Sequence, residues 1–215
     1  MNMLHYTLLT DGNSDRALLP IVTWALREQG VRRAIHAEWA DLSRVLRRPR
    51  SLEARIAEAL ALYPCDLLCV HRDAERELPA KRRDEIATAL AAVISNDTLL
   101  PPVVCIIPVR MQEAWLLFDV AAIRAAAGNP NGKQPLRLPD LARIEQMPDP
   151  KETLRRLLRE ASGLRGRRLQ KFDDRPERVA AFMDDFAPLR TLSAFQRFEA
   201  ELREIVVAQA WHHGL

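Results

Sequence analysis

Residues 67–75 read Leu-Leu-Cys-Val-His-Arg-Asp-Ala-Glu, an apolar run that ends abruptly in charge. Four consecutive apolar residues have the length of a strand that is buried on both faces in a parallel sheet. Asp73 and Glu75 follow at alternate positions, so in an extended chain both carboxylates point to one side. Two such carboxylates can share a hard cation such as Mg²⁺; the alternative is a strand that simply runs into a solvated loop.

The sequence on either side of this stretch indicates three more strands, at residues 4–10, 32–39 and 103–108. Apolar residues at helical spacing separate them and predict helices at about 14–30, 51–63 and 79–94. Parallel neighbours need crossovers, and helices fill them. We therefore expect a small, doubly wound, mostly parallel four-stranded α/β sheet with helices on both faces, and residues 32–39 at its edge.

A further helix is predicted at residues 110–119, directly after the fourth strand. Glu113 then lies in its first turn, close to the carboxyl edge of the sheet where α/β proteins bind ligands. The helix dipole alone also favours an acid at this position.

The loop at residues 128–139 is rich in Gly, Asn and Pro and divides the chain. We expect an α/β domain over residues 1–127 and a helical extension over 128–215 that packs on it. Asp149 is predicted to cap a helix that begins at Pro150 and runs through Glu160. Two more helices are expected at about 176–185 and 193–211.

Residues 151–175 hold nine basic residues against four acidic ones, the strongest basic cluster of the chain. Charge runs are usually solvated faces, but a cluster beside an acidic metal edge is typical of a surface for the phosphate backbone. The candidate nucleic-acid-binding residues are Arg155, Arg156, Arg159, Arg165, Arg167 and Arg168.

The composition sets wide limits on function. A chain of 215 residues with 48% hydrophobic content can bury a substantial core, and a net charge of +3 permits nucleic-acid binding without requiring it. Three cysteines without a regular Cys/His framework argue against disulfides and structural zinc. No signal peptide or membrane-length apolar run is visible, so a cytoplasmic protein is expected.

The acidic positions form a pattern that resembles the TOPRIM domain. In that family a Glu-Gly turn after the first strand and a later Asp-x-Asp pair bind Mg²⁺ in topoisomerases, primases, recombination proteins and OLD-type nucleases. Here Asp11-Gly12, with Asp15 three residues on, precedes the Asp73 and Glu75 pair. Residues 108–110, the helix start at 113–117 and the Asp-Pro-Lys at 149–151 look more closely like a bacterial family of unknown function related to TOPRIM. The similarity spans residues 4–160.

This resemblance implies roles for individual residues. The implied ligands for Mg²⁺ or Mn²⁺ are Asp11, Asp73 and Glu75, with Asp73 also catalytic. Glu113 becomes a second metal ligand or a general base, and Lys151 stabilises developing charge on phosphorus. Gly12 allows close backbone approach at the turn, while Asp15 either caps the helix or contacts metal. Arg72 and Arg110 lie within the motifs and are included as further site residues.

Taken together, the resemblance implies a Mg²⁺-dependent phosphoryl-transfer enzyme, a nuclease in genome maintenance or phage defence. Asp11 and Glu75 depart from the family's Glu and Asp, and each exchange shifts a carboxylate by one methylene. The alternative is therefore a non-catalytic module that binds nucleic acid or protein. A nucleotide-binding protein ranks last, because residues 11–14 lack a Gly-x-Gly-x-x-Gly pattern and a P-loop lysine. The expected partner is nucleic acid, held through backbone phosphates, with a homo-oligomer or partner protein possible and no membrane.

Overall fold

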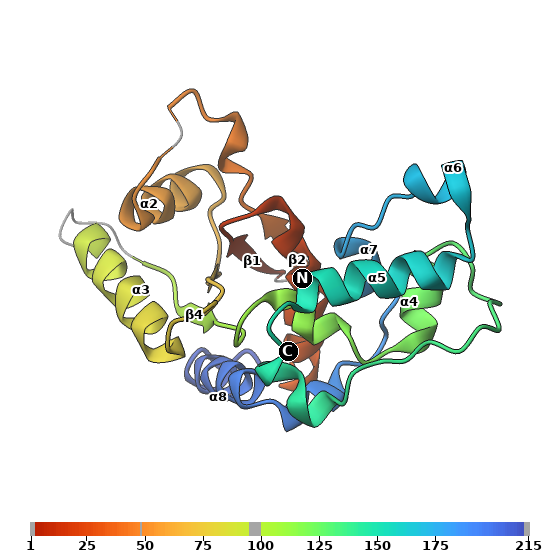
Figure 1. Cartoon of the computed structure of the whole chain (residues 1–215). Coiled ribbons are helices and arrows are strands. Elements are labelled where there is room, and N and C mark those ends of the chain that lie inside the picture. The colour runs from red at the N-terminus through yellow and green to blue at the C-terminus, as the bar shows by residue number, and fades with distance from the viewer. Residues whose placement is uncertain (1–2, 48, 95–99, 213–215) are drawn as a thin grey trace.

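The computed structural model describes residues 3–47, 49–94 and 100–212, and its core is a four-stranded sheet (Figure 1). The strands are β1 (Leu4–Leu9), β2 (Ile35–Trp39), β3 (Leu67–His71) and β4 (Val103–Ile106). All neighbours are parallel, and the order is β2-β1-β3-β4. The predicted doubly wound α/β sheet is confirmed, with β2 at one edge.

Helices connect the strands and continue after them. The α-helices are α1 (Leu18–Glu28), α2 (Leu52–Leu62), α3 (Pro79–Ile94), α4 (Val120–Ala126), α5 (Pro150–Ser162), α6 (Gly166–Gln170), α7 (Glu177–Ala180) and α8 (Ser193–Ala208). Short 3-10 helices are η1 (Asn13–Ala17), η2 (Leu42–Arg44), η3 (Gln112–Leu116), η4 (Leu141–Gln146) and η5 (Ala187–Thr191). No helix of the described residues is long and apolar enough to cross a membrane.

Alternation along the central strand divides the core between the two faces of the sheet. Leu67 and Cys69 of β3 pack with α1, α4, α5 and α8, whereas Leu68 and Val70 pack with α2 and α3. This is the period of two expected for a strand covered on both sides. In Figure 1, α2 and α3 lie together at the left and α4 to α7 gather at the right.

The residues after 128 share the core of the first face. Trp115 is fully buried, and its ring lies edge-on to Phe195 of α8 at 5.2 Å between centroids. Leu154 and Leu157 of α5 belong to the same cluster. The helical extension therefore packs on the sheet, and the division at residue 128 remains a prediction.

The structure corrects the helix predicted at residues 110–119. Arg110 has a left-handed backbone (φ 71°), and only the short η3 follows it. Asp119 then caps a separate helix, because its side chain accepts a hydrogen bond from the Ala122 N–H. Similarly, the helix predicted at 176–185 is only the short α7, and the one predicted at 14–30 begins as the 3-10 turn η1.

We predict that Trp115→Ala lowers the free energy of unfolding by about 3–5 kcal/mol, because it leaves a large cavity where the sheet meets α8. Urea denaturation measures the change. Phe182→Ala is the control, since Phe182 is 49% exposed and its truncation should cost about 0.5 kcal/mol or less. Equal losses in both variants would contradict the packing described here.

Candidate functional site

The sheet topology marks one edge as the place for a ligand. From β1 the chain goes to β2 on one side, and β3 then lies on the other side of β1. This reversal between β1 and β3 is a topological switch point, where open α/β sheets form a crevice beyond the carboxyl ends of the strands. Asp11 follows β1 and Asp73 follows β3. Both are therefore at the position where the fold binds ligands.

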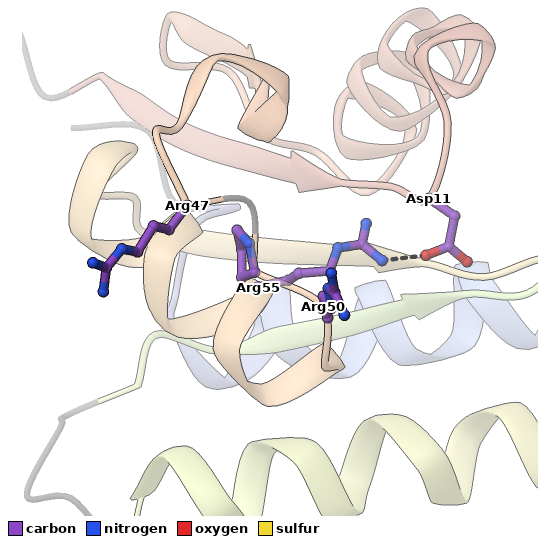
Figure 2. Close-up of a pocket in the computed structure, with 5 residues that line it drawn as sticks. Asp11, Arg47, Arg50 and Arg55 are labelled. Carbon is purple, nitrogen blue, oxygen red and sulfur yellow. Dashed lines mark hydrogen bonds and ion pairs between the residues drawn. The ribbon is translucent and has the colours of Figure 1, made fainter.

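Asp11 is held by Arg55 and Arg72, and Figure 2 shows the contact with Arg55. Arg55 of α2 donates hydrogen bonds to the Asp11 carboxylate and to the Thr10 carbonyl. The Arg72 Nε atom lies 3.1 Å from Asp11 Oδ2, as an ion pair without hydrogen-bond geometry. Burial opposes ionisation of Asp11, but the hydrogen bond and charges of these arginines outweigh it and lower its pKa. Asp11 is thus a carboxylate already neutralised by protein groups.

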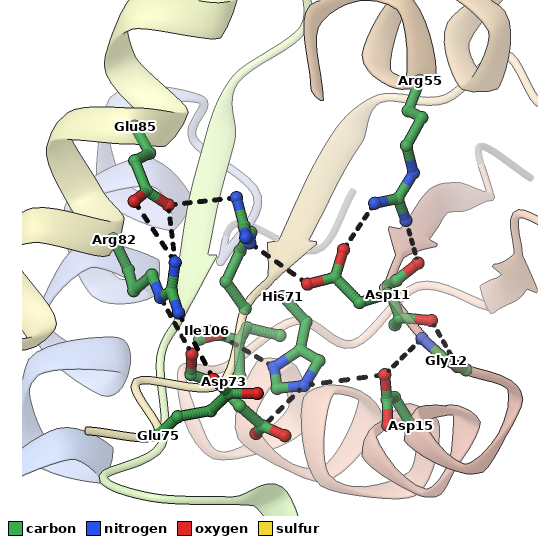
Figure 3. A network of polar contacts seen from close by, with 12 residues as sticks. Asp11, Gly12, Asp15, Arg55, His71, Asp73, Glu75, Arg82, Glu85 and Ile106 are labelled. Carbon is green, nitrogen blue, oxygen red and sulfur yellow. Dashed lines mark hydrogen bonds and ion pairs between the residues drawn. The ribbon is translucent and has the colours of Figure 1, made fainter. Parts of the chain in front are cut away.

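The second feature is a buried histidine between two carboxylates (Figure 3). His71 Nδ1 donates to the Ile106 carbonyl at 3.0 Å, since a carbonyl oxygen can only accept. Its Nε2 atom then faces Asp73 Oδ1 at 3.4 Å and Asp15 Oδ2 at 3.8 Å. His71 is 2% exposed and Asp15 7%. A proton on Nε2 would be shared between two acids.

Asp73 is an electrostatically strained acid of this group. Burial, together with the charges of Asp15 and Glu113, raises its pKa to about 6 against the opposing effects of His71 and the Gln112 N–H. Its Oδ1 atom accepts a hydrogen bond from the Gln112 backbone at 2.9 Å. Among the described residues, Oδ2 has no hydrogen bond or ion pair. Asp73 therefore keeps one carboxylate oxygen for a ligand.

Glu113 and Lys151, two residues with predicted catalytic roles, come together. Glu113 lies in η3 and is 2% exposed, and its Oε1 atom is 3.6 Å from Lys151 Nζ at the start of α5. Asp149 positions that start, because its carboxylate accepts a hydrogen bond from the Glu152 N–H. The site thus contains one lysine beside three acids, which are Asp15, Asp73 and Glu113.

Glu75 does not join these acids. Its backbone is left-handed (φ 55°), so the chain is not extended there, and its side chain is 62% exposed and 3.7 Å from Arg82. Arg110, also left-handed, accepts the Glu75 N–H at its carbonyl and donates to the Glu75 carbonyl from Nη1. Strained backbone of this kind is typical of functional sites. Arg110 therefore holds the loop after β3.

The predicted ligand trio is not assembled as one metal site. Within the described ranges, no three His, Cys, Asp or Glu side chains are grouped so that they could hold an ion. Asp11 faces Arg55 and Arg72, and Glu75 faces Arg82. Asp15, whose carboxylate also accepts the Gly12 N–H, lies with Asp73 instead. Asp15 both caps the turn at Gly12 and faces the site, so neither of its two predicted roles excludes the other.

Two residues of the site were missed by sequence reasoning. His71 is two residues before Asp73, and this spacing on an extended strand was a signal that it shares the same side. Gln112 gave no signal. It is 0% exposed, and its side-chain amide has no hydrogen-bond partner among the described residues. A buried amide without a partner is unusual and calls for a functional explanation.

The predicted basic surface is only partly free. Arg155 and Arg159 of α5 lie 4.0 and 3.8 Å from Asp174, and Arg156 is 3.3 Å from Glu160. Arg165, Arg167 and Arg168, at the start of α6, are exposed and have no acidic partner in the part of the chain that is described. Among the six candidate arginines, these three are the ones without an acidic partner in the described residues.

We predict that Asp73→Asn raises stability at neutral pH. Raising the pKa from 3.8 to about 6 makes ionisation of Asp73 in the folded protein cost about 2–3 kcal/mol. The folded state binds this proton more tightly, so stability falls as pH rises from about 4 to about 6. Urea denaturation should show a gain at pH 7.5 that shrinks at pH 4, with the exposed Asp184→Asn as a control. A loss that is equal at both pH values would contradict this electrostatic strain.

Comparisons with models of protein families, with curated proteins and with solved structures found no match to this chain. The resemblance to TOPRIM remains a prediction, and function has to be argued from the site itself.

Proposed function

We propose that this protein is a divalent-cation-dependent phosphoryl-transfer enzyme, a nuclease that acts on phosphodiesters. The observation that carries the proposal is Asp73. It is a half-buried carboxylate at the switch point of the sheet, with one open oxygen, and it is repelled by Asp15 and Glu113. Lys151 adds a cation beside Glu113.

The donor set fits a hard cation. Three acids near one another carry more negative charge than His71 and Lys151 can offset, and a divalent ion would relieve this repulsion. Mg²⁺ is usually held by one or two carboxylates together with substrate phosphates, and it needs no complete cage of protein ligands. The residues that would hold Mg²⁺ or Mn²⁺ are Asp73 and Glu113. Such an ion stabilises charge on the phosphoryl oxygens.

The protein groups around Asp73 have distinct tasks in this proposal. Lys151, which is 38% exposed at its side chain, stabilises the negative charge that develops on the phosphoryl oxygens. His71 places its Nε2 atom between Asp15 and Asp73 and helps to position their carboxylates. The Gln112 N–H fixes the Asp73 carboxylate by its hydrogen bond to Oδ1.

A second function is favoured by Asp11. Its carboxylate is neutralised by Arg55 and Arg72, as expected of a structural ion pair and not of a vacant metal ligand. In this alternative the chain is a non-catalytic module that binds nucleic acid or a partner protein, using Arg165, Arg167 and Arg168. Such binding is independent of metal.

We predict that Asp73→Asn lowers Mg²⁺- or Mn²⁺-dependent cleavage of DNA by about a hundredfold or more, because it removes an ion ligand. Cleavage of labelled single- and double-stranded DNA measures the effect. Glu77→Gln is the control, since Glu77 is exposed and its ion pair among the described residues is with Lys81, so this variant should keep wild-type activity.

Glu75→Gln separates the two ligand sets. Unchanged cleavage assigns the ion to Asp73 and Glu113, and lost cleavage restores the trio implied by the resemblance. If Asp73→Asn cleaves as fast as the wild type, the proposed enzyme is wrong.

For the alternative we predict binding to DNA in chelator, without cleavage in metal. Arg167→Gln/Arg168→Gln should weaken it about tenfold and flatten its salt dependence, because each arginine that meets a phosphate releases a counterion. Fluorescence anisotropy measures both quantities. Arg137→Gln/Arg143→Gln removes the same charge from another exposed segment and should have little effect. Cleavage that requires metal would reject the non-catalytic module.

A further inference from the structure

A hollow of about 690 Å³ lies between the end of β1 and the segment that precedes α2 (Figure 2). Its lining residues are Asp11, Arg47, Pro49, Arg50 and Arg55. Asp11 and Arg55 connect it to the switch point of the sheet, where Asp11 also contacts Arg72. The hollow is thus next to the candidate site but contains none of the acids around Asp73.

The lining carries excess positive charge. Three arginines face one acid, and that acid is already shared between Arg55 and Arg72. Arg47 and Arg50 are exposed and have no hydrogen bond or ion pair with any residue that the structure describes. Single exposed arginines are usually solvated, but here two unpaired ones line the same hollow as a third that is largely buried.

The local backbone adds to this charge. Arg50 and Arg55 flank the first turn of α2, where Ser51 caps the helix by accepting the Ala54 N–H. The helix dipole places partial positive charge at this end. Arginine binds phosphate through a planar fork of donors, so the preferred ligand of the hollow is a phosphate group.

We propose that this hollow is a second site, which binds the phosphate backbone of a nucleic-acid strand beside the carboxylates. In Figure 2, Arg55 reaches toward Asp11, and the Arg47 guanidinium lies at the opposite end of the group. Cations at both ends match successive phosphates of a strand better than one phosphate of a mononucleotide. The catalytic use of this site rests on the proposed function, whereas the binding itself requires no metal.

Arg55 gives the site a link to the acids. Its guanidinium is now occupied by Asp11 and the Thr10 carbonyl. A phosphate in the hollow competes for Arg55 and loosens its hold on Asp11. The strand then lies with successive phosphates in the hollow and a further one directed toward Asp73.

The test is binding of a fluorescent twelve-nucleotide single strand to the full chain in chelator, measured by anisotropy over a range of salt. Arg47→Gln/Arg50→Gln should weaken binding by about tenfold or more and lower the salt slope by about one to two, because two phosphate contacts are lost. The control Arg137→Gln/Arg143→Gln removes equal charge and should stay within about twofold. Thermal unfolding checks that each variant is folded, and Arg47→Lys/Arg50→Lys should keep most of the salt slope.

Equal weakening by both double variants, or no binding by the wild type, overturns the site. Competition with inorganic phosphate and with a mononucleotide identifies the ligand. Displacement of the strand by either at the same concentration as by unlabelled strand also overturns the proposal, since the hollow then binds a small phosphate. The proposed enzyme is judged separately. If Arg47→Gln/Arg50→Gln leaves both strand binding and metal-dependent cleavage unchanged, only the proposed phosphate site is rejected. If the wild type binds the strand but never cleaves it, only the proposed enzyme is rejected.

Discussion

The structure depends on how charged residues are accommodated directly after the fully buried strand β3. All five of its residues are buried, and within two further residues the chain carries the charges of Arg72 and Asp73. Burying such groups without partners is costly, so other elements must supply the compensation. Arg72 pairs with Asp11 and with Glu85 of α3, and the turn after β4 supplies the Gln112 N–H to Asp73. The end of β3 therefore depends on groups from the loop after β1, from α3 and from the turn after β4.

The acids at the carboxyl edge of the sheet are not equally neutralised, and this difference divides the edge into two halves. On one side Asp11, Glu75 and Glu85 each face one or two arginines, from the set Arg55, Arg72 and Arg82. On the other side three acids share one histidine and one lysine. Folding alone would favour satisfying both halves. Uncompensated charge of this kind lowers stability, and such sites are often functional, so we place the proposed function in the second half.

The sequence was sufficient for the sheet because its signals are local. Four short apolar runs separated by helical periodicity define the strands, and parallel pairing follows from the helices between them. Side-chain partners across the fold were not predictable. The pairing of Glu113 with Lys151 depends on how α5 packs against η3. Glu75 points away from the other acids because its backbone is left-handed, a conformation that a glutamate in the sequence does not indicate. The contacts of Arg55 with Asp11 and of Arg82 with Glu75 were not predictable either, because the paired residues are far apart in the sequence or on different elements.

The loops after β3 and β4 are laced together by backbone hydrogen bonds. The N–H groups of Arg72, Ala74 and Glu75 donate to carbonyls of Ile106, Pro108 and Arg110 in turn. These hydrogen bonds join the two loops into one unit. Neither loop can move as a lid without breaking its hydrogen bonds to the other. Any movement that opens or closes the site around a ligand is therefore expected in the long side chains that surround these two loops. The carboxyl edge of the sheet therefore combines a rigid backbone with arginine side chains that can change their contacts.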